Sequence, residues 1–507
     1  MRLLHDDTSW RFRTSDSVLV SQSDRNGNTV LIARDSQGRV TALTEPRGRQ
    51  LTFSYTGTNL RIDRITDPLG RTVQYTYDAQ GRLETVTDPA GAVTRYTYDA
   101  NHRLLTITDP RNITFLSNEF DAQGRVIRQT QADGGIWAFA YTTTGNFISQ
   151  TKVTDPRGNP TTYRFNSAGY LTQQTDTLGQ NTTFERQPGT NLLLSTTDPL
   201  SRVTRFTYYA NGNVTSITDP LGNTRTFTYD STFNKVTSIT DPLGNVTTFE
   251  YDGQGNLIAI TDPEQNLKPA PERLKTQIAY NQFGQPISTT DPLGNTTTFT
   301  YDSTGNLAAI TDPLSNTTQR TYDLVSRLIT QVDPLGEITR FSYDALNRLV
   351  SIVDALNGVT SLGYDPNGNL LTLTDARGST ITHEYDSMDR LSRRIDQLGK
   401  AGTFSYDVMG DGHENMTFPL RGMGQYGTLH PNTGRCIRTI PVLVSPSLCS
   451  ASPASMPRKP STTSWKAGRS SLTSLIPARS SASASSISSK TIRIVPTGAS
   501  ALPMAWW

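Results

Sequence analysis

The sequence predicts an all-β protein in which tandem antiparallel β-hairpins of about 21 residues each form one long curled sheet, a spiral or a partial hollow shell. The first observation is a fixed period. Asp-Pro pairs begin at Asp67, Asp88, Asp109, Asp155, Asp198, Asp219, Asp241, Asp262, Asp291, Asp312 and Asp333. Degenerate copies keep the phase at Asp24, Glu45-Pro46, Asp133, Asp176, Asp354, Asp375 and Asp396. Such a period is typical of one supersecondary unit stacked many times.

The second observation is the content of one unit. Asp291-Pro292-Leu293-Gly294 is a turn signal, because Asp accepts backbone N–H groups, Pro presets φ and Gly tolerates a left-handed backbone. Thr297, Phe299 and Tyr301 then stand at every second position, and this period of two in β-favouring residues predicts a half-buried strand.

A second turn over residues 302–306 leads into a second strand over 307–311. Its apolar residues Leu307 and Ile310 are three positions apart, which allows two interpretations: both faces are covered, or a β-bulge intervenes. The third observation is the density of Gly, Pro, Thr and Asn, which leaves no helical segment of useful length before residue 410.

About 18 such hairpins in series predict one antiparallel sheet, which must coil because sheets twist with a fixed hand. We expect an aromatic ladder on one face, formed by Phe227/Tyr229, Phe249/Tyr251, Phe299/Tyr301 and Phe341/Tyr343. The repeat spacing breaks between Asp262 and Asp291, where a charged, Pro-containing insertion near residues 264–275 is expected to loop off the sheet.

The repeated motifs are interpreted as structural. The predicted turn positions are Asp67, Pro68, Gly70, Asp219, Pro220, Gly222, Asp291, Pro292 and Gly294, and the predicted Tyr-Asp positions are Tyr77, Asp78, Tyr251, Asp252, Tyr301, Asp302, Tyr343 and Asp344. Two alternative roles for these Asp residues are calcium binding between units and acid–base catalysis by pairs of carboxylates. We favour the interpretation that each Asp caps its own turn, because so many equivalent copies argue against a unique metal-binding or catalytic site. No catalytic, cofactor-binding or metal-binding residue is predicted, and no enzymatic activity.

Composition excludes several classes of function. The formal net charge of +2 gives no overall case for nucleic-acid binding. No apolar run is long enough for a membrane-spanning helix, and no cleavable signal peptide is visible. The location is unknown from the sequence, and secretion or surface display by a signal-less route is favoured. Both cysteines, Cys436 and Cys449, lie outside the repeats.

The unit Tyr-Asp-x-x-Gly-Asn/Arg-Leu followed by Asp-Pro-x-Gly resembles the YD repeat of the RHS family over roughly residues 15–410. That family comprises bacterial rearrangement-hotspot proteins, wall-associated proteins, the C component of insecticidal toxin complexes and teneurins. The resemblance implies a strip of hairpins that spirals into a shell around a C-terminal toxic domain and serves contact-dependent bacterial competition.

One departure from the family pattern concerns cleavage. Relatives that release their cargo carry an Asp-Pro-x-Gly-Leu signature for autocleavage. Here the Asp-Pro-Leu-Gly copies are followed by Arg71, Asn223, Asn245, Asn295 and Glu337, and never by Leu. No protease residue is therefore carried over, and no N-terminal delivery domain is expected ahead of the array.

The repeat pattern stops near residue 410. Residues 1–414 hold 37 Lys and Arg against 45 Asp and Glu, whereas residues 415–507 hold 10 Lys and Arg and no acid. Three interpretations of the Ser/Pro/Arg-rich region 411–507 stay open: a disordered tail, a product of a reading-frame shift, or a divergent effector domain. Two domains are thus expected, the repeat array over 1–410 and this tail.

The leading hypothesis is a non-enzymatic shell fragment, here truncated, that would encapsulate or present a C-terminal effector. The expected partners are that effector or a secretion-spike protein, both absent from this chain, with no nucleic acid and no membrane span. The alternative is a cell-surface adhesion or carbohydrate-binding repeat protein whose partners are surface glycans.

Overall fold

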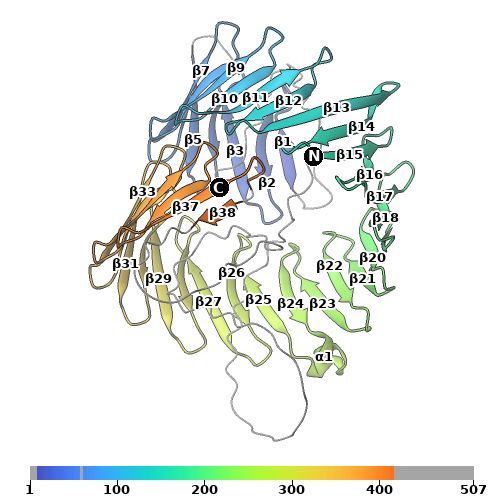
Figure 1. Ribbon diagram of the computed structural model, residues 1–507. Helices are drawn as coiled ribbons and strands as arrows, with labels where there is room; N and C mark the ends of the chain where they lie inside the picture. The colour runs from blue at the N-terminus through green and yellow to red at the C-terminus, as the bar shows by residue number, and fades with distance from the viewer. Residues whose placement is uncertain (1–7, 57–60, 411, 416–507) are drawn as a thin grey trace, which may run out of the picture. The chain divides into compact units, whose positions relative to one another are not determined.

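The computed structural model of the chain describes residues 8–56, 61–410 and 412–415 (Figure 1). The chain divides into two compact units, residues 1–418 and residues 419–507. All of the described residues belong to the first unit. The expectations for the tail beyond residue 415 lie outside the described residues.

The first half of the repeat array contains strands β1 to β19. Their bounds are β1 Ser9–Phe12, β2 Leu19–Ser23, β3 Thr29–Arg34, β4 Val40–Thr44, β5 Gln50–Tyr55, β6 Ile62–Thr66, β7 Thr72–Tyr77, β8 Leu83–Thr87, β9 Val93–Tyr98, β10 Leu104–Thr108, β11 Thr114–Phe120, β12 Val126–Gln131, β13 Ile136–Thr144, β14 Phe147–Thr154, β15 Pro160–Phe165, β16 Leu171–Thr175, β17 Asn181–Arg186, β18 Leu193–Thr197 and β19 Val203–Tyr208.

The second half contains the other strands and the insertion. Their bounds are β20 Val214–Thr218, β21 Thr224–Tyr229, β22 Val236–Thr240, β23 Val246–Tyr251, β24 Leu257–Thr261, α1 Pro263–Asn266, the 3₁₀ turn Ala270–Glu272, β25 Thr276–Tyr280, β26 Pro286–Thr290, β27 Thr296–Tyr301, β28 Leu307–Thr311, β29 Thr317–Tyr322, β30 Leu328–Val332, β31 Ile338–Tyr343, β32 Leu349–Val353, β33 Val359–Tyr364, β34 Leu370–Thr374, β35 Thr380–Tyr385, β36 Leu391–Ile395, β37 Ala401–Tyr406 and β38 Gly412–Asn415.

These strands form one 38-stranded antiparallel sheet in which strands adjacent in sequence pair with each other. Among the described residues, β1 pairs with β2 and β38 pairs with β37, so the sheet is not closed on itself. The prediction of an all-β array of antiparallel hairpins is therefore confirmed. The array continues slightly beyond the expected end at residue 410, because β38 pairs with β37.

A β-bulge in the Tyr-Asp hairpin of β27 and β28 explains the spacing of the apolar residues. Tyr301 lies opposite Leu307, but Thr300 lies opposite Ala309, so β28 carries one extra residue. Leu307 and Ile310 consequently face the same side as Tyr301 and Phe299, their partners on β27. Of the two interpretations left open by the sequence, the bulge is correct. Because bulges increase local twist, their repetition favours a curled strip.

The sheet is one layer thick. On β27 the aromatic residues Phe299 and Tyr301 are half-buried, whereas Thr298 and Thr300 on the other face are exposed. The fully buried apolar residues in the described part are few: Ala42, Phe53, Val153 and Ala259. Stability must therefore come from contacts between neighbouring hairpins, as in other repeat proteins.

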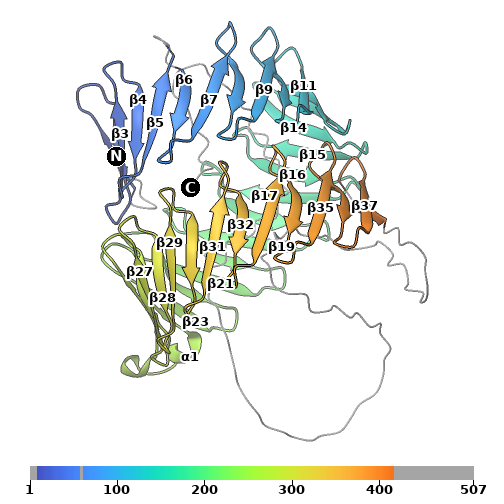
Figure 2. The same cartoon turned by 90° about the vertical axis from the view of Figure 1, so that its left-hand side faces the viewer.

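The strip coils so that its beginning and its end lie side by side. Figure 1 shows the strands following one another around a ring, and Figure 2 shows β27–β37 as a second tier beside β3–β14. The turn after β2 contacts the turn after β25 through Asn28 and Phe283. The turn after β12 contacts the turn after β35 through Asp133 and Arg390. In both cases the strand number rises by 23, and the contact of Arg71 with Ala345, from the turn after β6 to the turn after β31, spans 25, so one coil takes about 23 to 25 strands.

The insertion between β24 and β25 does not simply leave the sheet, as the sequence suggested. Its first turn, α1, packs against β23 because Asn266 donates hydrogen bonds from Nδ2 to the carbonyl oxygens of Val246 (2.7 Å) and Thr261 (3.2 Å). The covered Thr261 is 2% exposed. Asn266 thus holds α1 against β23, and Thr261 at the end of β24 is buried there.

Candidate functional site: the turns and edges of the strip

Two kinds of turn alternate along the strip and project from its opposite edges. Asp-Pro turns and their degenerate copies follow the even-numbered strands, and Tyr-Asp turns follow the odd-numbered strands. Both kinds use one hydrogen-bond scheme. Asp291 accepts the backbone N–H groups of Leu293 (2.8 Å) and Asn295 (2.9 Å), and Asp302 accepts those of Thr304 and Asn306 (both 2.9 Å). Each Asp therefore satisfies its own turn.

The structure places the other predicted positions in the same geometry. The Asp carboxylates that accept N–H groups two and four residues further on include those of Asp67, Asp78, Asp219, Asp252 and Asp344. The backbone N–H groups of Gly70, Gly222 and Gly294 close the Asp-Pro turns on the Asp carbonyls at 2.9–3.0 Å. Pro68, Pro220 and Pro292 occupy the second turn position.

The carboxylates of Asp291 and Asp219 are held in their charged form. The side-chain N–H of Asn295 is the main cause that lowers the pKa of Asp291, and backbone N–H groups add to it against a small effect of burial. Asn223 lowers the pKa of Asp219 in the same way. A low pKa and a saturated set of donors suit a turn cap and give these groups no proton to exchange near neutral pH.

Tyrosine hydroxyls join each hairpin to the one before it. The hydroxyl of Tyr301 donates to the backbone carbonyl of Pro286 at 2.8 Å, across 15 residues. The same bond, at 2.7–3.0 Å, is made by Tyr55, Tyr77, Tyr141, Tyr208, Tyr251, Tyr322, Tyr343, Tyr364, Tyr385 and Tyr406. The Tyr of the motif is therefore a connector between repeat units.

Arginines at the end of many Tyr-Asp turns make a second connection. Nε of Arg348 donates to Asp344 at 2.6 Å, and Nη1 donates to the backbone carbonyl of Asp365 in the next Tyr-Asp turn at 2.7 Å. Its guanidinium also lies over the ring of Tyr364. The same combination recurs at Arg82, Arg103, Arg327 and Arg390. This ladder was not predicted from the sequence, although the spacing of four residues from Asp to Arg is present in the motif.

Unlike edges of the strip meet where its two coils touch. We call this contact the seam: Asp-Pro turns of residues 24–157 against Tyr-Asp turns of residues 252–410. Arg111 is its most connected residue. Nη1 of Arg111 donates to the carbonyl oxygen of Asp386 at 3.1 Å, and Nη2 lies 2.8 Å from a carboxylate oxygen of Asp389. Nearby, Asn367 donates to Asp109, which is 5% exposed.

Further along the seam the contacts are also polar. Arg71 donates to the carbonyl oxygen of Ala345 at 2.9 Å and to Oδ1 of Asn347 at 2.6 Å. Arg157 pairs with Asp407. Nothing in the repeat period says which turns will meet, so the seam could not be located from the sequence.

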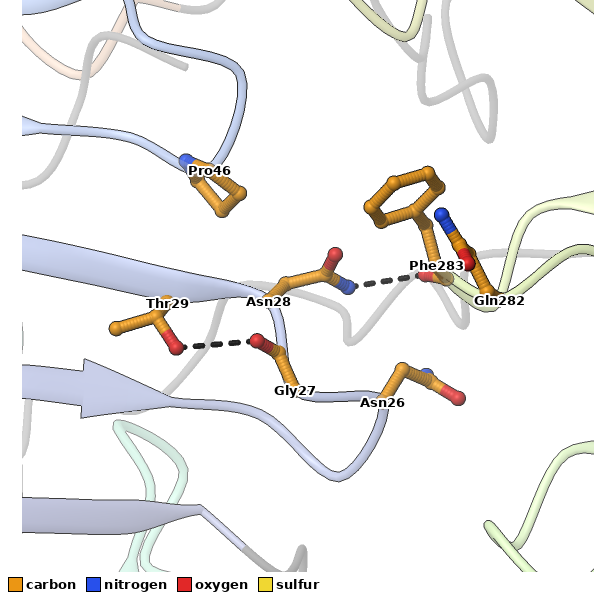
Figure 3. Close-up of a pocket in the computed structure, with 7 residues that line it drawn as sticks. All are labelled: Asn26, Gly27, Asn28, Thr29, Pro46, Gln282 and Phe283. Atoms are coloured by element: carbon orange, nitrogen blue, oxygen red, sulfur yellow. Dashed lines mark hydrogen bonds between the residues drawn. The ribbon is translucent and has the colours of Figure 1, made fainter.

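An open hollow of about 440 Å³ lies at the start of the seam (Figure 3). It is lined by Asn26–Thr29, Pro46, Gln282 and Phe283. Nδ2 of Asn28 donates across it to the carbonyl oxygen of Phe283 at 2.9 Å, and Arg47 lies over the Phe283 ring. The lining holds no acid, base or nucleophile beyond amides and one hydroxyl, so the hollow is a joint between coils.

The described part of the chain shows no group of three or more His, Cys, Asp or Glu side chains arranged to hold a metal ion. Within the described ranges, no helix is long and apolar enough to cross a lipid bilayer. The features that the structure does bring together are the two ladders, the seam and the edges of the strip.

One edge of the strip is unusually apolar. In turns after even-numbered strands that have no counterpart across the seam, the third position is mostly leucine. These residues are Leu178, Leu200, Leu221, Leu243, Leu293, Leu314, Leu335, Leu356 and Leu398, and they are 73–90% exposed. We call this row the leucine rim.

These features define a class of protein: a β-hairpin repeat protein in which contacts between Asp-Pro and Tyr-Asp turns hold a single-layer strip in a coil. The model of the RHS repeat matches residues 208–235, 231–266, 280–317, 322–359 and 364–401, and that of the teneurin YD-shell matches residues 69–184. Together the matches span more than half of the chain. The chain belongs to the RHS/YD-repeat family, as the resemblance of its motifs indicated.

A solved structure shows a similar fold. The chain is similar to the crystal structure of TcdB2-TccC3-TEV, with 14% identity and a TM-score of 0.50, over 79% of this chain and 25% of that one. The Photorhabdus luminescens Tc holotoxin pore matches with 14% identity and a TM-score of 0.43, over 75% of this chain and 26% of the other. This chain therefore spans about a quarter of the length of these proteins. The comparison with curated proteins found no match.

Proposed function

We propose that residues 1–410 form part of the wall of an RHS-type shell, which encloses or presents a C-terminal effector in contact-dependent competition between bacteria. The seam is the observation that carries the proposal. A sheet one layer thick can enclose a volume only if it coils and its successive coils are joined. Here the joints extend from Asn28–Phe283 to Arg157–Asp407.

The chemistry of the wall agrees with a structural role. The repeated carboxylates are saturated by their own turns, and the tyrosine hydroxyls and the arginines of the ladder are directed to neighbouring hairpins. Each motif is used for assembly of the strip. In this proposal an effector would follow the repeat array in the sequence.

Protection of a cargo tests the proposal. A small folded reporter is appended to the C-terminus of the full-length chain, and in a matched protein to its N-terminus. We expect protease and antibody to reach the C-terminal reporter at least tenfold more slowly than the N-terminal reporter. Equal accessibility of the two reporters would overturn enclosure of a C-terminal cargo.

A glycan array separates the wall from the alternative of a carbohydrate-binding adhesin. The full-length chain is applied to the array, with a chain carrying Tyr170→Ala and Tyr209→Ala as the control, because these two tyrosines are among the exposed aromatic residues. A shell wall gives no selective binding. Selective binding that disappears in the control variant would favour the adhesin.

A further inference from the structure

The leucine rim is the edge that the coil leaves uncovered. Its turns follow the even-numbered strands from β16 to β36, and the seam uses only the Asp-Pro turns of residues 24–157. Neighbouring turns of the rim are two strands apart, which is about 10 Å. The rim therefore presents a curved row of leucine side chains, which is interrupted at the insertion after β24 and at Arg377 after β34. A row of exposed apolar side chains along one edge is a candidate interaction site.

Within the chain itself, one leucine shows what happens when such a turn is covered. Leu69 occupies the same turn position as the rim leucines, but its turn lies in the seam, where Arg71 reaches Ala345 and Asn347. Leu69 is 36% exposed, against 87% for Leu221 and 90% for Leu356. The seam is therefore an established interface in which this turn position is partly withdrawn from water.

The Asp-Pro edge differs in composition between the part covered by the seam and the uncovered part. Only Leu69 is leucine among the third positions of Asp-Pro turns in the seam, where Asn26, Arg47, Arg111 and Arg157 make polar or cationic contacts. On the uncovered edge, leucine predominates. A row of leucines with no polar partner is costly in water unless another apolar surface covers it.

We propose that the leucine rim is the surface on which two copies of this chain associate, rim against rim, about a two-fold axis. In such an isologous contact the same patch serves both partners, so leucines meet leucines at the same spacing. The geometry permits it. A two-fold axis perpendicular to the axis of the coil carries a helical rim onto one of the same hand and slope. The gap between the two rims is then constant along their length.

Head-to-tail stacking fits the side chains less well. In that arrangement the rim of one copy would meet the uncovered Tyr-Asp edge of the next. That edge carries exposed polar residues at the same turn position, among them Gln37, Gln80, Asn101 and Gln123. Leucines would then remove these amides from water without replacing their hydrogen bonds, which is unfavourable. Head-to-tail contacts would also build open filaments, whereas the rim-to-rim contact is complete with two copies.

The charges at the rim add a distinguishing property. Each rim turn begins with a carboxylate, such as Asp219 and Asp241, that is bound to its own turn. Two facing rims therefore repel weakly while their leucines attract. Because salt screens exposed charges and leaves apolar burial intact, the association should become tighter as salt increases. An interface made of ion pairs would show the opposite dependence.

Sedimentation of the full-length chain over a wide concentration range tests the proposal. We expect a monomer–dimer equilibrium that tightens with salt. The variant Leu221→Gln with Leu243→Gln should weaken the dimer at least tenfold, because each substitution acts in both copies. The matched control is Leu31→Gln with Leu324→Gln, two exposed leucines away from the rim, and it should dimerise like the wild type.

Hydrogen exchange gives a second readout that does not depend on variants. Raising the protein concentration should slow exchange of the amides in turns 219–223 and 241–245, and leave turns 78–82 and 121–125 unchanged. The proposal is overturned by a monomer at all concentrations, by an open series of larger oligomers, or by a rim variant that behaves like its control. It does not depend on whether the shell encloses a cargo.

Discussion

The guanidinium of Arg348 lies over the aromatic ring of Tyr364, with its central carbon 4.9 Å from the ring centroid. The two residues belong to successive Tyr-Asp hairpins. The same guanidinium also holds Asp344 in its own turn and the carbonyl oxygen of Asp365 in the next one. Removing Arg348 therefore breaks a connection between repeat units as well as a contact within one turn.

Arg348→Ala is expected to lower the free energy of unfolding by about 2 kcal/mol, since charge-assisted hydrogen bonds and a cation–π contact are lost together. Urea unfolding followed by circular dichroism measures the change. The control is Arg202→Ala, because Arg202 is bonded to Asp198 in the same way but is 61% exposed. We expect less than about 1 kcal/mol there. Equal losses would show that the inter-hairpin contacts contribute nothing.

Tyr301→Phe tests the hydroxyl ladder. The ring stays in place, while the bond from the hydroxyl to the carbonyl oxygen of Pro286 is lost. The expected destabilisation is about 1 kcal/mol in urea unfolding. Tyr170→Phe, at a tyrosine that is 46% exposed, should be nearly neutral. A neutral Tyr301→Phe would mean that water serves this carbonyl equally well.

Arg111→Ala tests the seam. The substitution removes the hydrogen bond from Arg111 to the carbonyl oxygen of Asp386 and the positive charge that faces Asp389. The Arg111 side chain is only 15% exposed. We expect faster hydrogen exchange in turns 109–113 and 386–390 and a loss of about 2 kcal/mol. Arg377→Ala is the matched control, since Arg377 holds the same turn position on the uncovered edge. If both variants exchange alike, the seam does not stabilise the coil.

Ser315→Gly should stabilise the protein. Ser315 stands where most Asp-Pro turns have glycine, and its φ of 66° is left-handed, which is costly for a residue with a Cβ atom. Glycine relieves this strain, but it also has greater conformational freedom in the unfolded chain, which offsets part of the gain. The free energy of unfolding is expected to rise by about 0.5–1 kcal/mol. The reciprocal Gly294→Ala, at a φ of 88°, should destabilise by a similar amount. Thermal unfolding of both variants decides the matter, and a gain from Gly294→Ala would contradict it.

Acid should weaken the array. The pKa of Asp291 lies below its ordinary value, chiefly because the Asn295 side chain donates to it. A lowered native pKa contributes stability that is present above the unfolded value of about 3.9 and is lost as the pH falls through the native value. The urea midpoint should therefore drop below about pH 4. In Asp291→Asn the drop should be smaller, since the amide oxygen accepts the same N–H groups without titrating.

The sequence by itself determined the hairpin, its period and the role of each punctuating residue. Asp, Pro and Gly at fixed offsets specify turns, and alternating Thr and aromatic residues specify strands, because these preferences act over a few residues. The bulge stayed undecided at Leu307 and Ile310, since spacing alone does not show which face a residue takes. The ladder that includes Arg348 is tied to a local pattern, the spacing of four residues from Asp344 to Arg348, but its contact with the next hairpin was not predicted.

Only the tertiary structure decided where the strip meets itself. Arg111 follows β10 and Asp389 follows β35, 25 strands later. They are joined because the strip completes about one coil over that stretch, a length set by small twists accumulated over every hairpin. For the same reason Leu69 is partly covered while Leu356, in the same motif, is exposed. Identical local sequence thus acquires different surroundings from its place in the coil, which is information that no single repeat contains.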